Sequence, residues 1–347
     1  MSRPGPVPLP CSLDPLPDES LAGFLLRLSY RLQVSPMRLA RLTGSVKHHA
    51  DSVLGRRLLL DLDVGRFALA TRLTEEETAG LTLRPWRSRY PAIDKVLSHS
   101  DPRGTRADWL FNDLPRHCPQ CLAGDGSPVQ QQYGGIWKKA WHLPIAFACT
   151  THEVFLQNGC LQSHEFRRTM SQLIAQPADK SLHPAQCRFP TSADDPNAVS
   201  RKGRRGRSCG ARLDLPDNTG APRPSPSMLK TQRELIGLFD SDHPADEASS
   251  RFSDLQGATV VLRSVWPFSR DMIPNDAREA VAEHFNALEA NPPQEYGKLP
   301  SSPIATAGLL TAASAVLDGR GVLDMLVQHT RWYATSPEAG LGGSNFR

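Results

Sequence analysis

The chain has 347 residues, of which 39% are hydrophobic, and it contains 30 prolines and 25 glycines. One hydrophobic core rarely grows beyond roughly 250 to 300 residues, so this length predicts more than one domain, joined by long irregular connections. The net charge of +4 is too small to indicate a nucleic-acid partner by its sum alone. The sequence has no apolar run long enough to cross a bilayer and no apolar core of a signal peptide near its start, which favours a cytoplasmic protein without membrane contact.

The N-terminal part is predicted to be helical. A proline-rich leader covers residues 1–15, and Asp18 then follows a proline at a position where it can cap a helix. Apolar residues recur at helical spacing from there to Leu32, so one stripe of this helix should face a core. We expect residues 16–115 to form an N-terminal helical domain.

A second short helix is predicted directly after the first. Ser35 can act as its cap with Pro36 at the first helical position, and Gly44 marks its end. Helix, short turn and helix is the outline of a DNA-binding helix-turn-helix, in which Arg38 and Arg41 of the second helix would face DNA. Any small helical bundle has the same outline, so the pattern leaves both interpretations open.

Two closely spaced pairs of residues predict a metal centre. Two residues separate Cys118 from Cys121, a spacing that points two thiolates at one ion, and Cys149 and His152 repeat that spacing further along the chain. Such a set makes a closed tetrahedral zinc site without an open position for a substrate, so its role is to stabilise the fold. We expect residues 116–212 to form a central zinc module of the ribbon or knuckle type.

The segment between these pairs carries an alternating apolar face. Trp137 and Trp141 flank Lys138 and Lys139, and the alternation continues up to Cys149. This pattern favours a strand that covers the zinc module. Tryptophans beside lysines can stack on bases and hold phosphates, but this spacing beside an apolar run is more typical of a core.

The remaining cysteines of this region predict a second zinc site. Its ligands would be Cys160, His164, Cys187 and Cys209, with His183 as the substitute for His164. The spacing is irregular, so two zinc ions are expected and one is the alternative. Three ordinary cysteines without a metal are the other interpretation.

A run of basic residues lies inside the region of the second site. It consists of Arg201, Lys202, Arg204, Arg205 and Arg207, interleaved with glycines. A flexible basic loop beside a metal site can hold a phosphate backbone, and this favours nucleic acid slightly over a merely solvated loop.

The C-terminal third is predicted to be mainly helical. Residues 213–252 read as a linker that carries one amphipathic helix, and residues 253–347 as a C-terminal domain. Within that domain, the apolar run at 257–265 is strand-like. Three helices are then expected: one capped by Asp276 and Glu279, one from Ser302 to Gly319, and one over residues 323–333. The predicted fold class is therefore mainly α, with zinc-ribbon or zinc-knuckle modules.

Three segments in this order resemble the TniQ family, which includes the TnsD target selectors. They read PLPDESLAGFLLRLSYRLQVSP, RHCPQCLAGDG and WKKAWHLPIAFACTTHEVFL. The resemblance matches Asp18 to Leu21 with the family's opening helix, and the pairs at 118–121 and 149–152 with its first zinc site. The chain departs from the family after Cys160, where the usual Cys-Pro-x-Cys-Gly knuckle is stretched.

The resemblance implies a non-enzymatic accessory protein of DNA transposition. Such a protein binds target DNA or an RNA-guided targeting complex, and it recruits an AAA+ ATPase that regulates the transposase. A zinc-containing transcriptional regulator is the alternative function. An enzyme is disfavoured, because the sequence has no phosphate-binding glycine loop and no His-Glu-x-x-His motif. The oligomeric state stays open, a homodimer included.

Overall fold

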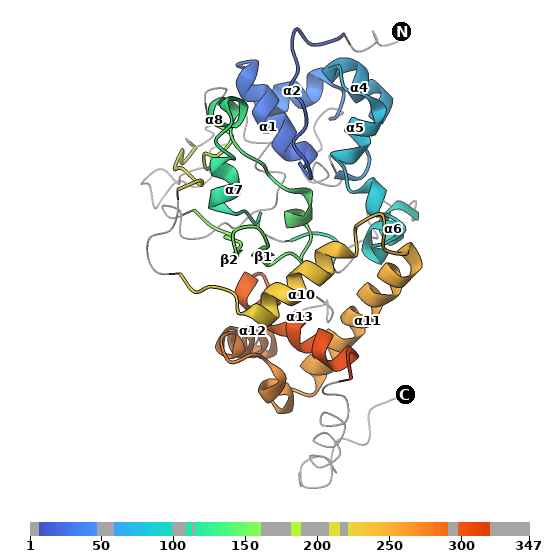
Figure 1. Cartoon of the computed structure of the whole chain (residues 1–347), viewed down its shortest axis with the longest axis vertical. Helices are drawn as coiled ribbons and strands as arrows, with labels where there is room; N and C mark the ends of the chain where they lie inside the picture. The colour runs from blue at the N-terminus through green and yellow to red at the C-terminus, as the bar shows by residue number, and fades with distance from the viewer. Residues whose placement is uncertain are drawn as a thin grey trace.

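The computed structural model describes residues 7–46, 59–98, 109–112, 115–160, 182–188, 208–215, 221–290 and 298–319. Over these residues the protein is mainly helical, as predicted, and has one sheet of two short strands. The helices of residues 21–80 lie at one end of the molecule, the cysteine-rich segment in the middle and the C-terminal helices at the other end, where the helix of residues 91–98 packs beside them (Figure 1). None of the described helices is both long and apolar enough to cross a membrane.

The N-terminal helices enclose an apolar core. The predicted first pair is present as α1 (Leu21–Arg31) and α2 (Pro36–Leu42). Further along come α4 (Val64–Thr71), α5 (Glu75–Gly80), the 3₁₀ helix η2 (Arg84–Trp86) and α6 (Pro91–Ser98). Helix α1 buries nearly its whole length, and its Phe24 ring meets Phe67 of α4 edge to face, with the ring centres 6.1 Å apart.

The two helix starts agree only partly with the prediction. Ser35 caps α2 and Pro36 occupies its first turn, as expected. The cap of α1 is Ser20 and not Asp18, so that prediction was wrong: the Ser20 hydroxyl accepts the N–H of Gly23 at 3.1 Å. Asp18 lies outside the helix in a left-handed conformation with φ of +62°. Its backbone is needed there to reach the cysteine-rich segment.

That contact is a short antiparallel clip between distant parts of the chain, residues 18–20 and residues 137–139. The N–H of Ser20 donates to the carbonyl of Trp137 at 2.8 Å, and the N–H of Lys139 donates to the carbonyl of Asp18 at 2.9 Å. Gly23 belongs to the same joint, because an added Cβ would lie 2.8 Å from the Cβ of Trp137. The clip packs α1 directly against the segment between the two cysteine pairs.

A buried ion pair lies beneath the clip. Arg27 of α1 donates to the Glu19 carboxylate at 2.7 Å, and both side chains are fully buried. Burial raises the pKa of Glu19 to about 7, although the neighbouring Arg27 guanidinium lowers it. One carboxylate oxygen and two guanidinium nitrogens of this pair lack a hydrogen-bond partner. Removing either partner of this pair should therefore strongly destabilise the N-terminal core.

The cysteine-rich segment has less strand than predicted. It contains α7 (Pro119–Ala123), α8 (Pro128–Tyr133), the 3₁₀ helix η3 (Lys139–His142), β1 (Ala148–Cys149) and β2 (Val154–Phe155). The expected long strand up to Cys149 is replaced by η3, a turn at Pro144 and Ile145, and the short strand β1. Two carbonyls that a ladder would use, those of Trp141 and Leu143, accept the side-chain amide of Asn112 at 2.8 and 2.9 Å. Pro144 removes a backbone donor.

The two tryptophans of this segment are core residues. Trp137 is 2% exposed and Trp141 is 3% exposed. Neither ring is free to stack on a nucleic-acid base. The structural interpretation that the spacing favoured is therefore confirmed.

The C-terminal helices form a bundle around one central helix. They are α10 (Pro226–Gly237), α11 (Ala245–Ser264), the 3₁₀ helix η4 (Phe268–Met272), α12 (Arg278–Ala290) and α13 (Pro303–Leu317). Helix α13 packs on α10, α11 and α12. It approaches the start of α12 closely, since a Cβ on Gly308 would lie 2.5 Å from that of Ala277, directly before α12, and 3.2 Å from a methyl group of Val281 within it. The predicted amphipathic helix, the helix after Asp276 and the helix capped by Ser302 are confirmed.

The strand predicted at 257–265 is wrong, because these residues continue α11 almost to the end of the run. Leu262 is buried whereas Val260 and Val261 are 39% and 40% exposed, which follows a helical period and not an alternation. The β-branched residues are tolerated because the opposite face of α11 packs on α13. Helix α11 also crosses position 252, where we expected the linker to end. The helix predicted over 323–333 lies outside the described residues.

Candidate metal centres

The four residues of the first predicted site come together in space. Cys118 and Cys121 flank the start of α7, Cys149 ends β1, and His152 lies in the turn between β1 and β2. The Nδ1 atom of His152 lies 3.4, 3.3 and 3.5 Å from the sulfurs of Cys118, Cys121 and Cys149. The sulfurs of Cys121 and Cys149 are 3.6 Å apart. These four residues can hold one metal ion.

The separations suit a tetrahedral ion. Zinc bonds of about 2.3 Å to sulfur and about 2.0 to 2.1 Å to nitrogen give tetrahedral edges of roughly 3.5 to 3.8 Å. The observed edges lie within a few tenths of an ångström of that range. Three cysteines and one histidine are a donor set typical of structural zinc. With all four positions filled by protein, the ion would have none left for a substrate.

Local backbone geometry places these ligands. The N–H of Cys121 hydrogen-bonds to the Cys118 sulfur, and the N–H of His152 to the Cys149 sulfur. Hydrogen bonds from the thiols of Cys118 and Cys121 lower the pKa of Cys149, and the hydrogen bond from the N–H of His152 lowers it further. Gly135 passes so close to the carbonyl of Cys121 that a Cβ would lie 2.1 Å from its oxygen. A glycine is therefore required where the chain returns past the first pair.

The second predicted site is present in part. Cys160, Cys187 and Cys209 form a cluster that can hold a metal, and the sulfurs of Cys160 and Cys209 lie 3.7 Å apart. His164 lies outside the described residues. His183, the substitute, is not a member of the cluster. Its Nδ1 atom instead accepts the N–H of Ala185 at 3.2 Å, so that assignment was wrong.

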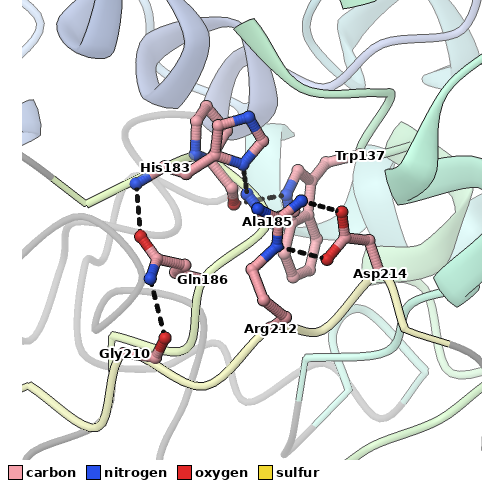
Figure 2. Close-up of polar contacts among 8 residues, drawn as sticks. Trp137, His183, Ala185, Gln186, Gly210, Arg212 and Asp214 are labelled. Carbon is pink, nitrogen blue, oxygen red and sulfur yellow. Dashed lines mark hydrogen bonds and ion pairs between the residues drawn. The ribbon is translucent and has the colours of Figure 1, made fainter. Parts of the chain in front are cut away.

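Figure 2 shows the polar contacts that hold the second cluster's loops together. The Gln186 side chain accepts the N–H of His183 at 2.8 Å and donates to the carbonyl of Gly210 at 2.8 Å. The Trp137 indole donates to the carbonyl of Pro184 at 3.3 Å. The loops around Cys187 and Cys209 are thus tied to each other and to the core of the first site. No short-range pattern in the sequence indicates these roles for Gln186 and His183.

The predicted nucleic-acid residues are described only in part. Arg38 and Arg41 lie on α2 with exposed side chains. Leu42 beside them is also 50% exposed, so this face of α2 is basic and partly apolar. The loop with Arg201, Lys202, Arg204, Arg205 and Arg207 lies outside the described residues.

These features define a mainly helical protein whose cysteine-rich centre can bind metal at two clusters. The model of the TniQ family matches residues 10–156, and this part of the chain, from the opening helix through the first metal cluster, is similar to that family. The family is associated with target selection in DNA transposition, and the predicted resemblance is confirmed. The second cluster and helices α10–α13 lie beyond the matched residues. Comparisons with curated proteins and with solved structures gave no match.

Proposed function

We propose that this protein is a non-enzymatic accessory factor of DNA transposition that acts in the cytoplasm. It binds target DNA or an RNA-guided targeting complex, and it recruits an AAA+ ATPase that regulates the transposase. The match of residues 10–156 to the TniQ family carries this proposal. It is supported by the closed ligand set of Cys118, Cys121, Cys149 and His152, which suits a structural and not a catalytic metal.

Zinc is the metal that we propose for both clusters. In the first cluster it would cross-link α7 to the turn between β1 and β2, and so stabilise the platform against which α1 packs. A four-ligand zinc site contributes folding free energy on the order of 10 kcal/mol. For the second cluster, His164 remains the proposed fourth ligand beside Cys160, Cys187 and Cys209.

DNA binding is proposed for the exposed face of α2. Helix α1, the turn before Ser35 and helix α2 have the outline of a helix-turn-helix, and the buried α1 would support α2 from below. Arg38 and Arg41 project from α2 on its exposed side, where long basic side chains can reach phosphates and base edges. The loop with Arg201 to Arg207 is proposed as a second, sequence-independent contact.

Duplex titrations at three salt concentrations test the DNA part of the proposal. Each lost phosphate contact should lower the slope of log affinity against log salt by about 0.9. Arg38→Ala and Arg41→Ala should change the preference between two unrelated duplexes if α2 enters the major groove. Arg270→Ala, which removes an exposed arginine from η4, is the matched control and should leave both quantities unchanged. No binding of the parent protein at low salt would leave only protein recruitment.

A pull-down from the native host tests the recruitment part. Co-purification of an AAA+ ATPase or a transposase supports the proposal. Capture of DNA without either protein would favour the alternative, a zinc-containing transcriptional regulator.

A further inference from the structure

The first metal cluster is braced by helices that lie far along the chain. Arg116, two residues before Cys118, is buried and donates to the carbonyls of Pro144 and Ala146 at 3.0 and 2.6 Å. Its other nitrogen reaches the start of α13, with the Pro300 carbonyl at 3.0 Å and the Thr306 hydroxyl at 3.1 Å. The chain just before the first ligand pair is thus bonded to the C-terminal bundle.

A second set of hydrogen bonds holds the chain directly before the other ligand pair. Gln232 of α10 is fully buried, and its side-chain oxygen accepts the N–H groups of Phe147 and Ala148 at 2.6 and 2.9 Å. Its amide nitrogen lies 3.4 Å from the carbonyl of Ile145. Ala148 is the residue before the ligand Cys149. In Figure 1, α10 runs beside β1 and β2, in agreement with these bonds.

These bonds satisfy backbone groups that the hairpin cannot satisfy itself. Strand β1 pairs with β2 through one edge only. Phe147 and Ala148 are buried, so their N–H groups would be left without a partner if Gln232 were apolar. An unsatisfied buried N–H is costly, and the strand could relieve that cost only by moving. Any such movement displaces the adjacent Cys149.

We propose that Gln232 is a positioning residue of the first metal centre. Through Phe147 and Ala148 it places Cys149, so the affinity for metal depends on a helix that lies outside the family-matched residues 10–156. Linkage requires the converse as well: bound metal stabilises the docking of α10. The inference is independent of the proposed role in transposition, since it concerns metal affinity alone.

Metal titration of the full-length chain tests this inference, with Co²⁺ as the spectroscopic probe and Zn²⁺ measured by competition with a chromophoric chelator. All proteins carry Cys187→Ser, which removes a thiolate from the second cluster and leaves the first as the tight site. We expect Gln232→Leu to weaken metal binding at the first cluster by about 10- to 100-fold, the usual effect of losing a partner outside the ligand set. It should also alter the Co²⁺ absorption at saturation, because Cys149 is displaced.

Two variants separate positioning from general loss of stability. Gln232→Glu keeps an oxygen that can accept both N–H groups, and it should restore the affinity to within a few-fold of the parent. Leu235→Ala opens a cavity one turn along the same helix without removing these bonds, and it should lower stability but leave the affinity and the spectrum unchanged. Equal losses of affinity in Gln232→Leu and Leu235→Ala would overturn the proposal. So would a Gln232→Leu protein with the affinity and spectrum of the parent.

If the Cys187→Ser background does not fold, the rate of Zn²⁺ release to the chelator is measured with the same substitutions in the otherwise unchanged chain. The expected result is a faster release phase for Gln232→Leu that is absent in Leu235→Ala. Identical release from both variants would refute the positioning role.

Discussion

Replacing Arg27 by methionine should destabilise the protein in a pH-dependent way. The substitution keeps the length of the side chain but leaves the Glu19 carboxylate buried without its counter-ion. At an effective dielectric constant of about 20, opposite charges as close as these attract by roughly 6 kcal/mol. Part of that is offset because the guanidinium no longer has to be desolvated. The expected cost at pH 8 is therefore roughly 3 to 5 kcal/mol, as for other broken buried pairs.

The sign of the pH effect follows from the raised pKa of Glu19. An unfolded glutamate titrates near about 4.3, whereas burial holds the folded pKa at about 7. The contribution of Glu19 to the stability of the parent is therefore fully present below the unfolded value and is lost as the pH rises through about 7. Without Arg27 the pKa rises further, so Glu19 protonates readily at pH 5.5. The difference between Arg27→Met and the parent should then be smaller than at pH 8 by about 1.4 kcal/mol, because pH 8 lies one unit above the folded pKa of about 7 in the parent.

Urea denaturation followed by circular dichroism at pH 5.5 and pH 8 measures this difference. Variant and parent are compared at the same pH, so the pH dependence of metal binding cancels. Arg87→Met is the matched control, because the Arg87–Asp94 pair is about half exposed, with both side chains at 52%. It should cost less than about 1 kcal/mol at either pH. An Arg27→Met cost that is equal at the two pH values would refute the reasoning.

The remaining predictions concern the metal and the clip. Elemental analysis should find two equivalents of zinc per chain and one after Cys187→Ser; under half an equivalent in the parent would contradict the zinc assignment. Cys121→Ser should make residues 116–212 sensitive to limited proteolysis while α10–α13 resist, since these helices also pack on one another; mass mapping of the fragments decides this. Gly23→Ala should cost about 1 to 3 kcal/mol by overpacking against Trp137. Gly80→Ala, where a Cβ meets nothing within 4 Å, should be near neutral in the same denaturation assay.

The first metal cluster was predictable because its geometry is local. Two residues between ligands place both donors on one turn, and this holds whatever the rest of the chain does. The caps of α2 and α13 were predictable for the same reason, since Ser35 and Ser302 bond to a backbone N–H three residues ahead. The predicted cap of α1 lies two positions before the observed cap, Ser20, because the carbonyl of Asp18 accepts the N–H of Lys139 in the clip.

Contacts between residues that lie far apart in the chain could not be predicted from the sequence. The run at 257–265 has strand-forming residues, but its conformation depends on the packing of α11 against α13. Gln232 reads as an ordinary residue of an amphipathic helix, although its partner Phe147 lies 85 residues earlier. Arg116 likewise reaches Pro300 across 184 residues. Such roles depend on which surfaces meet, and no short-range pattern specifies that.

The clip between residues 18–20 and 137–139 limits how this protein can be recombined with its relatives. A chimera that takes its N-terminal helices from a protein of the TniQ family would also have to take the segment from Gly134 to His142, because Gly23 and Trp137 leave no room for a different surface. A crossover placed between the N-terminal helices and Cys118 would split one joint between two parents. Segments that contact each other must therefore be exchanged together, even where they lie far apart in the sequence.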